Sequence, residues 1–238
     1  MCGRFATTGD IDFYAQYYGV DDVTTDSIDP SWNVAPTDES YVVAEHEERK
    51  LLGRMGWGLI PHWSKDNKSA HINARAETVA TAPAFRRPFT RHRCLIPADG
   101  FYEWEPKDKG RTPHWVYRAD GYPMSFAGIW SGWKDPKTEQ WTRRFAIITT
   151  KAEGVIAPIH DRMPVVLPQE SWEAWLDRDL TDPEMALDLL RPLDPDLIME
   201  YAVGNEVNNV RNNGASLRQP LSPALSPTQW GKGSPRTK

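Results

Sequence analysis

Residues 94–130 read CLIPADGFYEWEPKDKGRTPHWVYRADGYPMSFAGIW, and their pattern favours one fold class. Short apolar or aromatic runs alternate with segments rich in glycine, proline, aspartate and lysine, as is typical of β-strands joined by turns. The predicted strands cover residues 94–97, 101–104, 114–118 and 124–130. Between the last two, residues 119–122 (Ala-Asp-Gly-Tyr) carry the Asp-Gly signal of a tight hairpin, so we expect those strands to pair.

The same alternation extends to both sides of this stretch. Further strands are predicted within residues 41–57, at 145–150 and at 163–167. Helices are predicted at 10–18, with Asp10 as the N-cap, at 170–176, and from Pro183 to about Arg191, where Asp182 is the cap. Because strands do not alternate regularly with helices, a doubly wound parallel sheet is disfavoured. The sequence predicts an α+β domain built on a mostly antiparallel sheet.

Length and composition set the domain organisation. The chain has 238 residues, of which 39% are hydrophobic and 26% charged, as expected for a globular protein with a real core. We assign residues 1–220 to one domain. Residues 221–238 are rich in proline, serine and basic residues around an isolated Trp230, and we predict that they form a disordered tail.

The sequence also narrows the compartment and the partners. No apolar run approaches the length of a membrane span, and the first residues lack the features of a secretory signal. The two cysteines, Cys2 and Cys94, cannot build a disulfide framework. We therefore expect a cytoplasmic protein with no membrane partner. The formal net charge of -5 argues against a protein that coats duplex DNA by bulk charge.

Cys2 is the first candidate for chemistry, because it directly follows the initiator methionine. If Met1 is removed, the mature chain begins with an α-amine and a thiol on adjacent carbons. Their ordinary pKa values, about 7.7–8.0 and about 8.5, leave reactive fractions of both groups at neutral pH. The amine can condense with an aldehyde to an imine, and the thiol can then close a five-membered thiazolidine ring. The alternative is a small buried cysteine that merely follows Met1.

Three further polar positions could serve chemistry, and each has a structural alternative. Asn73 and Arg75 alternate with apolar residues, so both can point to one side of an extended segment, or they can belong to a solvated loop. Glu103 lies in an aromatic, strand-like run, where burial would raise its pKa and suit a general acid or base; a nearby arginine would instead neutralise it. His160, just before a predicted strand, could shuttle protons or simply bond to the backbone.

Several other site types find no support in the sequence. The histidines show no H-E-x-x-H or i, i+4 spacing, and the chain has no C-x-x-C pair, so we predict no metal site. A G-x-S-x-G elbow, a P-loop and a G-x-G-x-x-G motif are also absent from the sequence. No cofactor is expected.

Charge is distributed unevenly along the chain. Residues 71–94 contain five arginines against Glu77 alone, a net charge of +4, which leaves -9 on the rest of the chain. An aromatic run, Trp57-Gly58-Leu59-Ile60-Pro61-His62-Trp63, lies just upstream. Arginines beside exposed rings are how proteins bind single-stranded nucleic acid, with phosphates on the cations and bases on the rings. The alternative is that the tryptophans belong to the core and the arginines to a solvated face.

Taken together, these clusters resemble the SRAP family (SOS response-associated peptidase, also called abasic site processing proteins). The resemblance covers nearly the whole chain to about residue 220, with the motifs in the family's order. The motifs are Met1-Cys2-Gly3-Arg4-Phe5, Trp32-Asn33-Val34-Ala35-Pro36-Thr37, Gly56-Trp57-Gly58-Leu59-Ile60-Pro61, Asn73-Ala74-Arg75-Ala76-Glu77, Ala98-Asp99-Gly100-Phe101-Tyr102-Glu103-Trp104, Ile159-His160-Asp161-Arg162-Met163-Pro164 and Val207-Asn208-Asn209-Val210-Arg211-Asn212-Asn213-Gly214.

The resemblance implies a fold and an activity. The fold is one SRAP-type domain with a barrel-like, mostly antiparallel β core and flanking helices. The activity is binding of single-stranded DNA and covalent crosslinking to abasic sites during the DNA damage (SOS) response, with AP-lyase and crosslink-reversal activities. The partner would be single-stranded DNA containing abasic sites, together with replication or repair proteins. We expect a monomer that is nucleoid-associated if the source is bacterial.

The family's residue roles carry over position by position. Cys2 would form the thiazolidine, Asn73 would orient the sugar or the cysteine, Glu103 would move protons, and His160 would assist β-elimination or crosslink reversal. Family members often have a second basic contact after the Asn-Ala-Arg motif; here residues 82–84 (Ala-Pro-Ala) precede Phe85, and the basic residues begin at Arg86. The DNA-contacting candidates are Arg4, Arg75, Arg86, Arg162, Trp57, Trp63 and Trp104.

Two functions from other classes compete with crosslinking. The first is an N-terminal-nucleophile cysteine peptidase, in which the amine of Cys2 serves as the base and removal of Met1 is a mild form of the activity. The second is a passive reader of single strands or modified bases that uses only tryptophans and arginines. An abasic-strand adduct on Cys2 would separate crosslinking from both.

Overall fold

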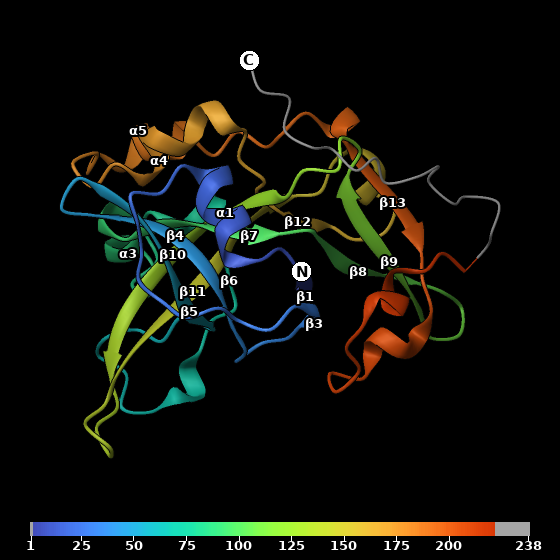
Figure 1. The fold of residues 1–238 in the computed structure, drawn as a ribbon, viewed down its shortest axis with the longest axis horizontal. Helices are drawn as coiled ribbons and strands as arrows, with labels where there is room; N and C mark the ends of the chain where they lie inside the picture. Colours follow the sequence, from blue (N-terminus) through green and yellow to red (C-terminus); the bar gives the residue numbers. More distant parts are fainter. Residues whose placement is uncertain (1, 222–238) are drawn as a thin grey trace.

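A computed structural model describes residues 2–221 of the chain. Its centre is a ring of strands in the order β11, β10, β7, β4, β5, which β5 closes by pairing with β11 (Figure 1). The closing pair is parallel, and the other neighbours in the ring are antiparallel. The core is therefore a barrel-like, mostly antiparallel sheet. The strands span Trp141–Lys151 (β11), Met124–Lys134 (β10), Arg93–Ala98 (β7), Glu39–His46 (β4) and Arg49–Trp57 (β5).

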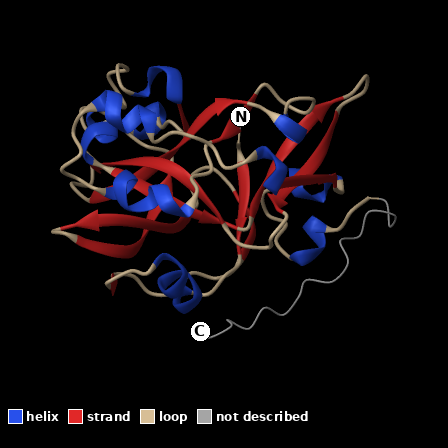
Figure 2. Ribbon diagram, turned by 90° about the horizontal axis from the view of Figure 1, so that it is seen from above, coloured by secondary structure: helices blue, strands red, loops and turns tan. Residues whose placement is uncertain are grey.

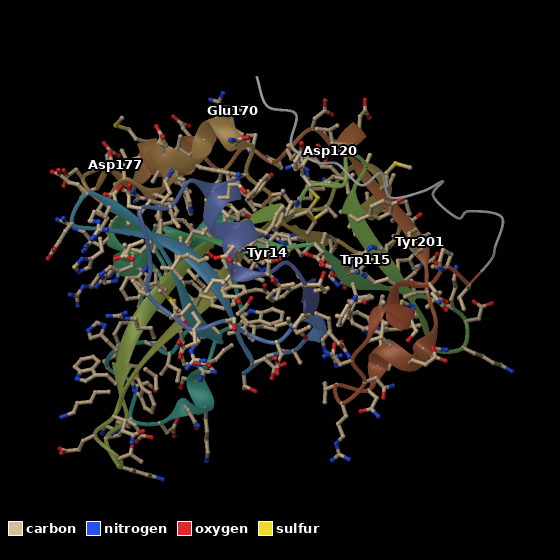
Figure 3. The ribbon with its side chains drawn as sticks, viewed as in Figure 1. Tyr14, Trp115, Asp120, Glu170, Asp177 and Tyr201 are labelled. Carbon is tan, nitrogen blue, oxygen red and sulfur yellow. The ribbon has the colours of Figure 1, made fainter. Side chains whose placement is uncertain are left out.

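A second antiparallel sheet packs against this barrel. Its strands, in spatial order, are β13 (Ile198–Ala202), β9 (Arg111–Arg118), β8 (Gly100–Pro106), β1 (Arg4–Thr7) and β3 (Ser31–Val34). Phe5 of β1 contacts Trp57 and Phe126 of the barrel edge-on, with ring centroids 5.1 and 6.0 Å apart. On β9 and β13, Trp115 and Tyr201 are register partners in a smaller apolar cluster and lie close together in Figure 3. Much of the tryptophan surplus is thus core packing.

Three short strands extend the barrel at its edges. β2 (Asp22–Val23) pairs with β5, while β6 (Asn73–Arg75) and β12 (Arg162–Pro164) both pair with β11. Thr149 of β11 is the register partner of Arg75 on one side and of Pro164 on the other. The motifs at residues 73–77 and 159–164 are therefore brought together across β11.

Short helices lie around the strands (Figure 2). Asp10 caps the first helix by accepting a hydrogen bond from the Phe13 N–H at 2.7 Å, and Asp182 accepts one from the Glu184 N–H at 2.8 Å. Both predicted caps are confirmed. None of the helices within residues 2–221 has the length and apolarity that a membrane crossing requires. The helices are α1 (Ile11–Tyr18), α2 (Ala76–Val79), α3 (Arg86–Arg91), α4 (Trp172–Leu176) and α5 (Pro183–Asp188), with 3₁₀ turns at Asn67–Ser69, Gly154–Ile156, Gln169–Ser171, Pro195–Leu197, Asn205–Asn208 and Ala215–Arg218.

The α+β, mostly antiparallel fold is confirmed, with three differences in detail. Residues 119–122 do not form a hairpin, because β9 pairs with β8 and β13 whereas β10 pairs with β7 and β11. This turn passes the chain from one sheet to the other. The last predicted helix ends at Asp188 rather than near residue 191, and the strand predicted at 163–167 ends at Pro164. The tail predicted for residues 221–238 lies outside the described residues apart from Leu221.

Gly100 provides a test of how closely the second sheet is packed. A Cβ at this position would lie 2.2 Å from the Val116 carbonyl oxygen, which is backbone and cannot swing away. We expect Gly100→Ala to destabilise the protein by about 1–3 kcal/mol, lowering Tm by roughly 2–12 °C in a thermal melt. Gly132→Ala is the matched control, since its Cβ would meet only the Trp141 ring at 3.7 Å. Equal melting temperatures for the two variants would contradict this packing.

Candidate active site

Cys2 lies just before β1, and its side chain is fully buried. The Asn73 amide Nδ2 donates a hydrogen bond to the Cys2 carbonyl oxygen at 2.9 Å. Asn73 can reach it because β6 pairs in parallel with β11, next to Ile147. The buried Asn73 Oδ1 has no hydrogen-bond donor among the described residues. Asn73 thus contacts Cys2 through its side-chain nitrogen, and its side-chain oxygen remains available as a hydrogen-bond acceptor.

Glu103 adds a negative charge beside the cysteine. It lies on β8, the neighbour of β1, and is only 3% exposed. Burial and then the charge of Glu103 raise the pKa of the Cys2 thiol well above its ordinary value. Cys2 is therefore a protonated thiol at neutral pH, and a base must take its proton before the sulfur can attack an electrophile. Glu103 is close enough to influence that proton.

His160 precedes β12 and is partly exposed. Its Nδ1 accepts a hydrogen bond from the Arg162 backbone N–H at 3.0 Å and lies 2.8 Å from Asp161 Oδ1. His160 therefore lies between the backbone amide of Arg162 and the side chain of Asp161 at the start of β12.

Arg162 presents its fork to a carboxylate within the protein. Its two terminal nitrogens, Nη1 and Nη2, donate to Glu77 Oε1 and Oε2 at 2.6 and 2.8 Å, and Nη2 also donates to the Thr149 carbonyl at 2.6 Å. Hydrogen bonding to Arg162 lowers the pKa of Glu77. The Arg162 side chain is 11% exposed and that of Glu77 is 52% exposed, so Glu77 covers the guanidinium from the solvent side. Arg75, on β6 at the other side of β11, is exposed.

Arg4 is partly exposed and makes several hydrogen bonds within the protein. Its Nη1 donates to Asn33 Oδ1 and to the Val207 carbonyl, both at 2.8 Å. The Asn33 amide in turn donates to the carbonyls of Asn209 and Asn212 at 3.1 and 2.9 Å. Arg4 and Asn33 therefore fasten the late segment 205–214 to the strand that follows Cys2, while the phosphate contact of the partly exposed Arg4 stays a prediction.

The candidate tryptophans divide into two groups. Trp57 is fully buried, with its Nε1 donating to the Ile72 carbonyl at 2.9 Å, so the prediction that it packs against a DNA base is wrong. Trp63 is 52% exposed and available to a base. Trp104 is partly exposed and donates from Nε1 to Asn208 Oδ1 at 2.7 Å, beside the late segment.

The basic strip predicted for residues 71–94 is also only partly a surface. Arg86, Arg87 and Arg91 lie exposed on α3. Arg93 is buried, and its guanidinium donates to the carbonyls of Phe89 and Trp175 at 2.9 and 2.6 Å. Arg93 is therefore not available to a phosphate, and the exposed part of the strip carries one positive charge fewer than the sequence predicted.

The structure thus brings Cys2, Asn73 and Glu103 together directly. It places His160 and Arg162 one strand away, across β11. Sequence reasoning missed Asn33 and Glu77 as organisers of the site, although both stand inside motifs already quoted. The site therefore combines a buried thiol, a side-chain amide, a carboxylate and, one strand away, an imidazole.

Comparison with known proteins identifies the family of this chain. Residues 1–210 match the family model described as SOS response associated peptidase (SRAP). Abasic site processing protein YoqW of Bacillus subtilis (strain 168) is 38% identical over 221 residues, covering 91% of this chain and 98% of that protein. Abasic site processing protein YedK of Escherichia coli (strain K12) is 32% identical over 226 residues, covering 93% and 100%.

Solved structures show the same fold. The crystal structure of a protein from Bacteroides thetaiotaomicron superposes with a TM-score of 0.83 at 26% sequence identity. The superposition covers 93% of this chain and the whole of that one. The family model and the relatives together confirm the resemblance carried by the sequence motifs, and the chain belongs to the SRAP family.

Proposed function

We propose that this protein, once Met1 is removed, binds single-stranded DNA and crosslinks covalently to abasic sites through Cys2. The observation that carries the proposal is the contact of Asn73 with the Cys2 backbone beside the buried carboxylate of Glu103. The names of YoqW and YedK, both abasic site processing proteins, support it.

The reaction balances without a cofactor. The α-amine of Cys2 attacks C1′ of the ring-opened sugar, and the carbinolamine loses water to give an imine. The thiol then adds to the imine carbon, its proton passes to the nitrogen, and a thiazolidine closes. Net, one water leaves and no electrons are exchanged. Glu103 would take the thiol proton, and Asn73 Oδ1, which has no donor among residues 2–221, would accept a hydrogen bond from an N–H of the amine.

His160 would serve the other steps. It lies across β11 from Asn73, and an imidazole at this position is a candidate general acid or base for β-elimination or crosslink reversal. We propose AP-lyase and reversal activities for this group. Phosphates of the bound strand would meet Arg75, Arg86 and Arg162, and bases would meet Trp63 and Trp104.

Intact mass spectrometry of the purified protein, mixed with an abasic oligonucleotide, tests the proposal. We expect one species whose mass is that of the chain without Met1 plus the oligonucleotide minus one water. An intact oligonucleotide of the same length should give no adduct. Turnover of peptides that is lost in Glu103→Gln would instead indicate a peptidase, and equal affinity for both oligonucleotides without any adduct would indicate a passive reader.

Glu77 offers a prediction about phosphate binding. Its carboxylate occupies both terminal nitrogens of Arg162, where a phosphate would bind. We expect Glu77→Gln to raise the affinity for intact single-stranded DNA about 5-fold, the size of one ion pair of about 1 kcal/mol. The salt dependence should steepen by about 0.7 in log K against log salt. Fluorescence anisotropy across a salt series measures both quantities.

The matched control for Glu77 is Glu184→Gln, which removes one negative charge from an exposed position on α5. It should leave both the affinity and the salt slope unchanged. Weaker binding by Glu77→Gln would show that Glu77 holds Arg162 in place for the DNA rather than covering it.

We further propose a monomer that acts in the cytoplasm and meets replication or repair proteins at damaged single strands. Size-exclusion chromatography with light scattering, with and without an abasic oligonucleotide, measures the first of these. One protein per oligonucleotide is the expected stoichiometry.

A further inference from the structure

A row of rings and cations lies on one face of the hairpin formed by β10 and β11. Lys134 pairs with Trp141, Gly132 with Arg143, and Trp130 with Phe145. Directly opposed residues of an antiparallel pair point to the same side, as do residues two apart on one strand. Trp130, Arg143, Trp141 and Lys134 therefore share one face, on which aromatic and cationic side chains alternate.

Trp141 is held so that one side of its ring is open. It is 71% exposed, more than any other large apolar side chain in the described part of the chain. A Cβ built on Gly132 would lie 3.7 Å from the Trp141 ring, so the ring rests over the glycine, where no side chain lifts it away. One face of the indole therefore lies against the β10–β11 hairpin, and its other face is open to solvent, where a base can stack on it.

The row continues toward the barrel. The Arg143 guanidinium carbon lies 5.9 Å from the centre of the Trp130 ring, and Trp130 stacks on His92 with centroids 4.5 Å apart and planes 23° apart. Burial, followed by the charges of Arg178, Arg87 and Arg91, lowers the pKa of His92 to about 4. His92 is thus neutral at pH 7, and arginines surround this end of the row.

A cavity of about 370 Å³ opens where the row of rings and cations meets the barrel, between β4, β5 and the β10–β11 hairpin. Met55 and Leu51 supply apolar walls, and Trp130, Arg143 and Arg54 line the same space. Asp26 and Glu45 also line it and can accept hydrogen bonds from exocyclic amino groups such as those of cytosine. Its volume lies within the range of pockets that hold small planar ligands.

This row is remote from the cysteine. The hairpin projects beyond the barrel, away from β1 (Figure 1). Trp141 and Thr149 stand eight residues apart on β11, which is about 26 Å at the usual rise of a strand. At the other end, the Thr149 carbonyl accepts a hydrogen bond from Arg162. β11 therefore runs from the Arg162 guanidinium, which is proposed to bind a phosphate, to the row of rings and cations. A chain that reached both ends would extend over several nucleotides.

We propose that this face, defined by His92, Trp130, Lys134, Trp141 and Arg143 with the adjoining cavity, is a second binding surface for single-stranded DNA. It takes the strand beyond the abasic nucleotide. Alternating rings and cations match the alternation of bases and phosphates in an unpaired strand. Duplex DNA fits less well, because its bases are stacked on each other and are not free to cover Trp141. The proposal rests on the proposed function for the identity of the strand.

Trp141→Ala tests the surface with little effect on folding, because the side chain is exposed. The measurement is anisotropy with intact single strands of 4 and 20 nucleotides, which cannot crosslink. We expect the affinity for the longer strand to fall about 5- to 100-fold, the usual cost of losing one stacked base, and that for the shorter strand to stay the same. Trp141→Phe should recover most of the affinity, and Met185→Ala, another exposed apolar residue on α5, should change nothing.

Equal affinity of Trp141→Ala and the unchanged protein for the 20-nucleotide strand would overturn the proposal. So would an equal loss on duplex DNA, which would show that Trp141 does not act by stacking on unpaired bases. Adduct formation with a short abasic strand is measured in parallel. An adduct with no effect of Trp141 refutes the second surface alone, and a Trp141 effect with no adduct refutes the crosslinking function alone.

Discussion

Cys2→Ala is expected to abolish the heat-stable adduct with an abasic single strand while leaving noncovalent DNA binding unchanged. The variant keeps an α-amine after Met1 removal, so an imine still forms. Without the thiol no thiazolidine can close, and the imine hydrolyses when the sample is heated. A denaturing gel after heating, together with intact mass spectrometry, measures the loss.

Two controls make this result specific. Treatment of the Cys2→Ala mixture with borohydride should trap the imine as a stable secondary amine, which shows that the amine remains in the site. Cys94→Ala should crosslink normally, although Cys94 is equally buried and burial likewise raises its thiol pKa. A heat-stable adduct in Cys2→Ala without any reductant would contradict a role for the thiol.

Local signals in the sequence predicted local structure well. Asp10 and Asp182 were recognisable as caps because an N-cap acts within three residues of its own position. Strands on both sides of residue 100 were recognisable by composition. The closure of the barrel was not, because the parallel pairing of β5 with β11 joins residues nearly ninety positions apart and leaves no local signature. The hairpin at residues 119–122 failed for the same reason: its turn signal is local, whereas the choice of sheet is not.

The same difference between local and nonlocal information decides which site residues could be predicted. Cys2 could be singled out because its chemistry follows from its place in the chain. Residue type alone could not tell a surface arginine or tryptophan from a buried one: Arg93 of the basic strip is buried, and the prediction for Trp57 failed on burial. Trp141 was overlooked because its significance depends on Gly132 and Arg143 lying beside it across the ribbon.

Glu103→Gln is expected to slow adduct formation by about 10²–10⁴-fold, the usual contribution of a positioned acid or base. The substitution keeps the size of a side chain that is 3% exposed and removes its charge. That charge raises the pKa of the Cys2 thiol, so the variant should have a lower thiol pKa and a larger thiolate fraction at any given pH. Loss of proton transfer would slow crosslinking, whereas a larger thiolate fraction would speed it. The direction of the net change therefore identifies the role of Glu103.

If Glu103 acted only by its charge on the sulfur, Glu103→Gln would crosslink faster, since more thiolate would be present. If Glu103 moves protons, crosslinking slows even though the thiol becomes more acidic. Rates of adduct formation across a pH series, set beside rates of thiol alkylation followed by mass spectrometry, separate the two cases. Slower crosslinking together with a thiol pKa shifted downward is the expected pair of results. Crosslinking at the unchanged rate would show that another group takes the thiol proton. Glu103→Asp keeps the carboxylate but shortens its reach, so its crosslinking rate should fall between those of the unchanged protein and Glu103→Gln.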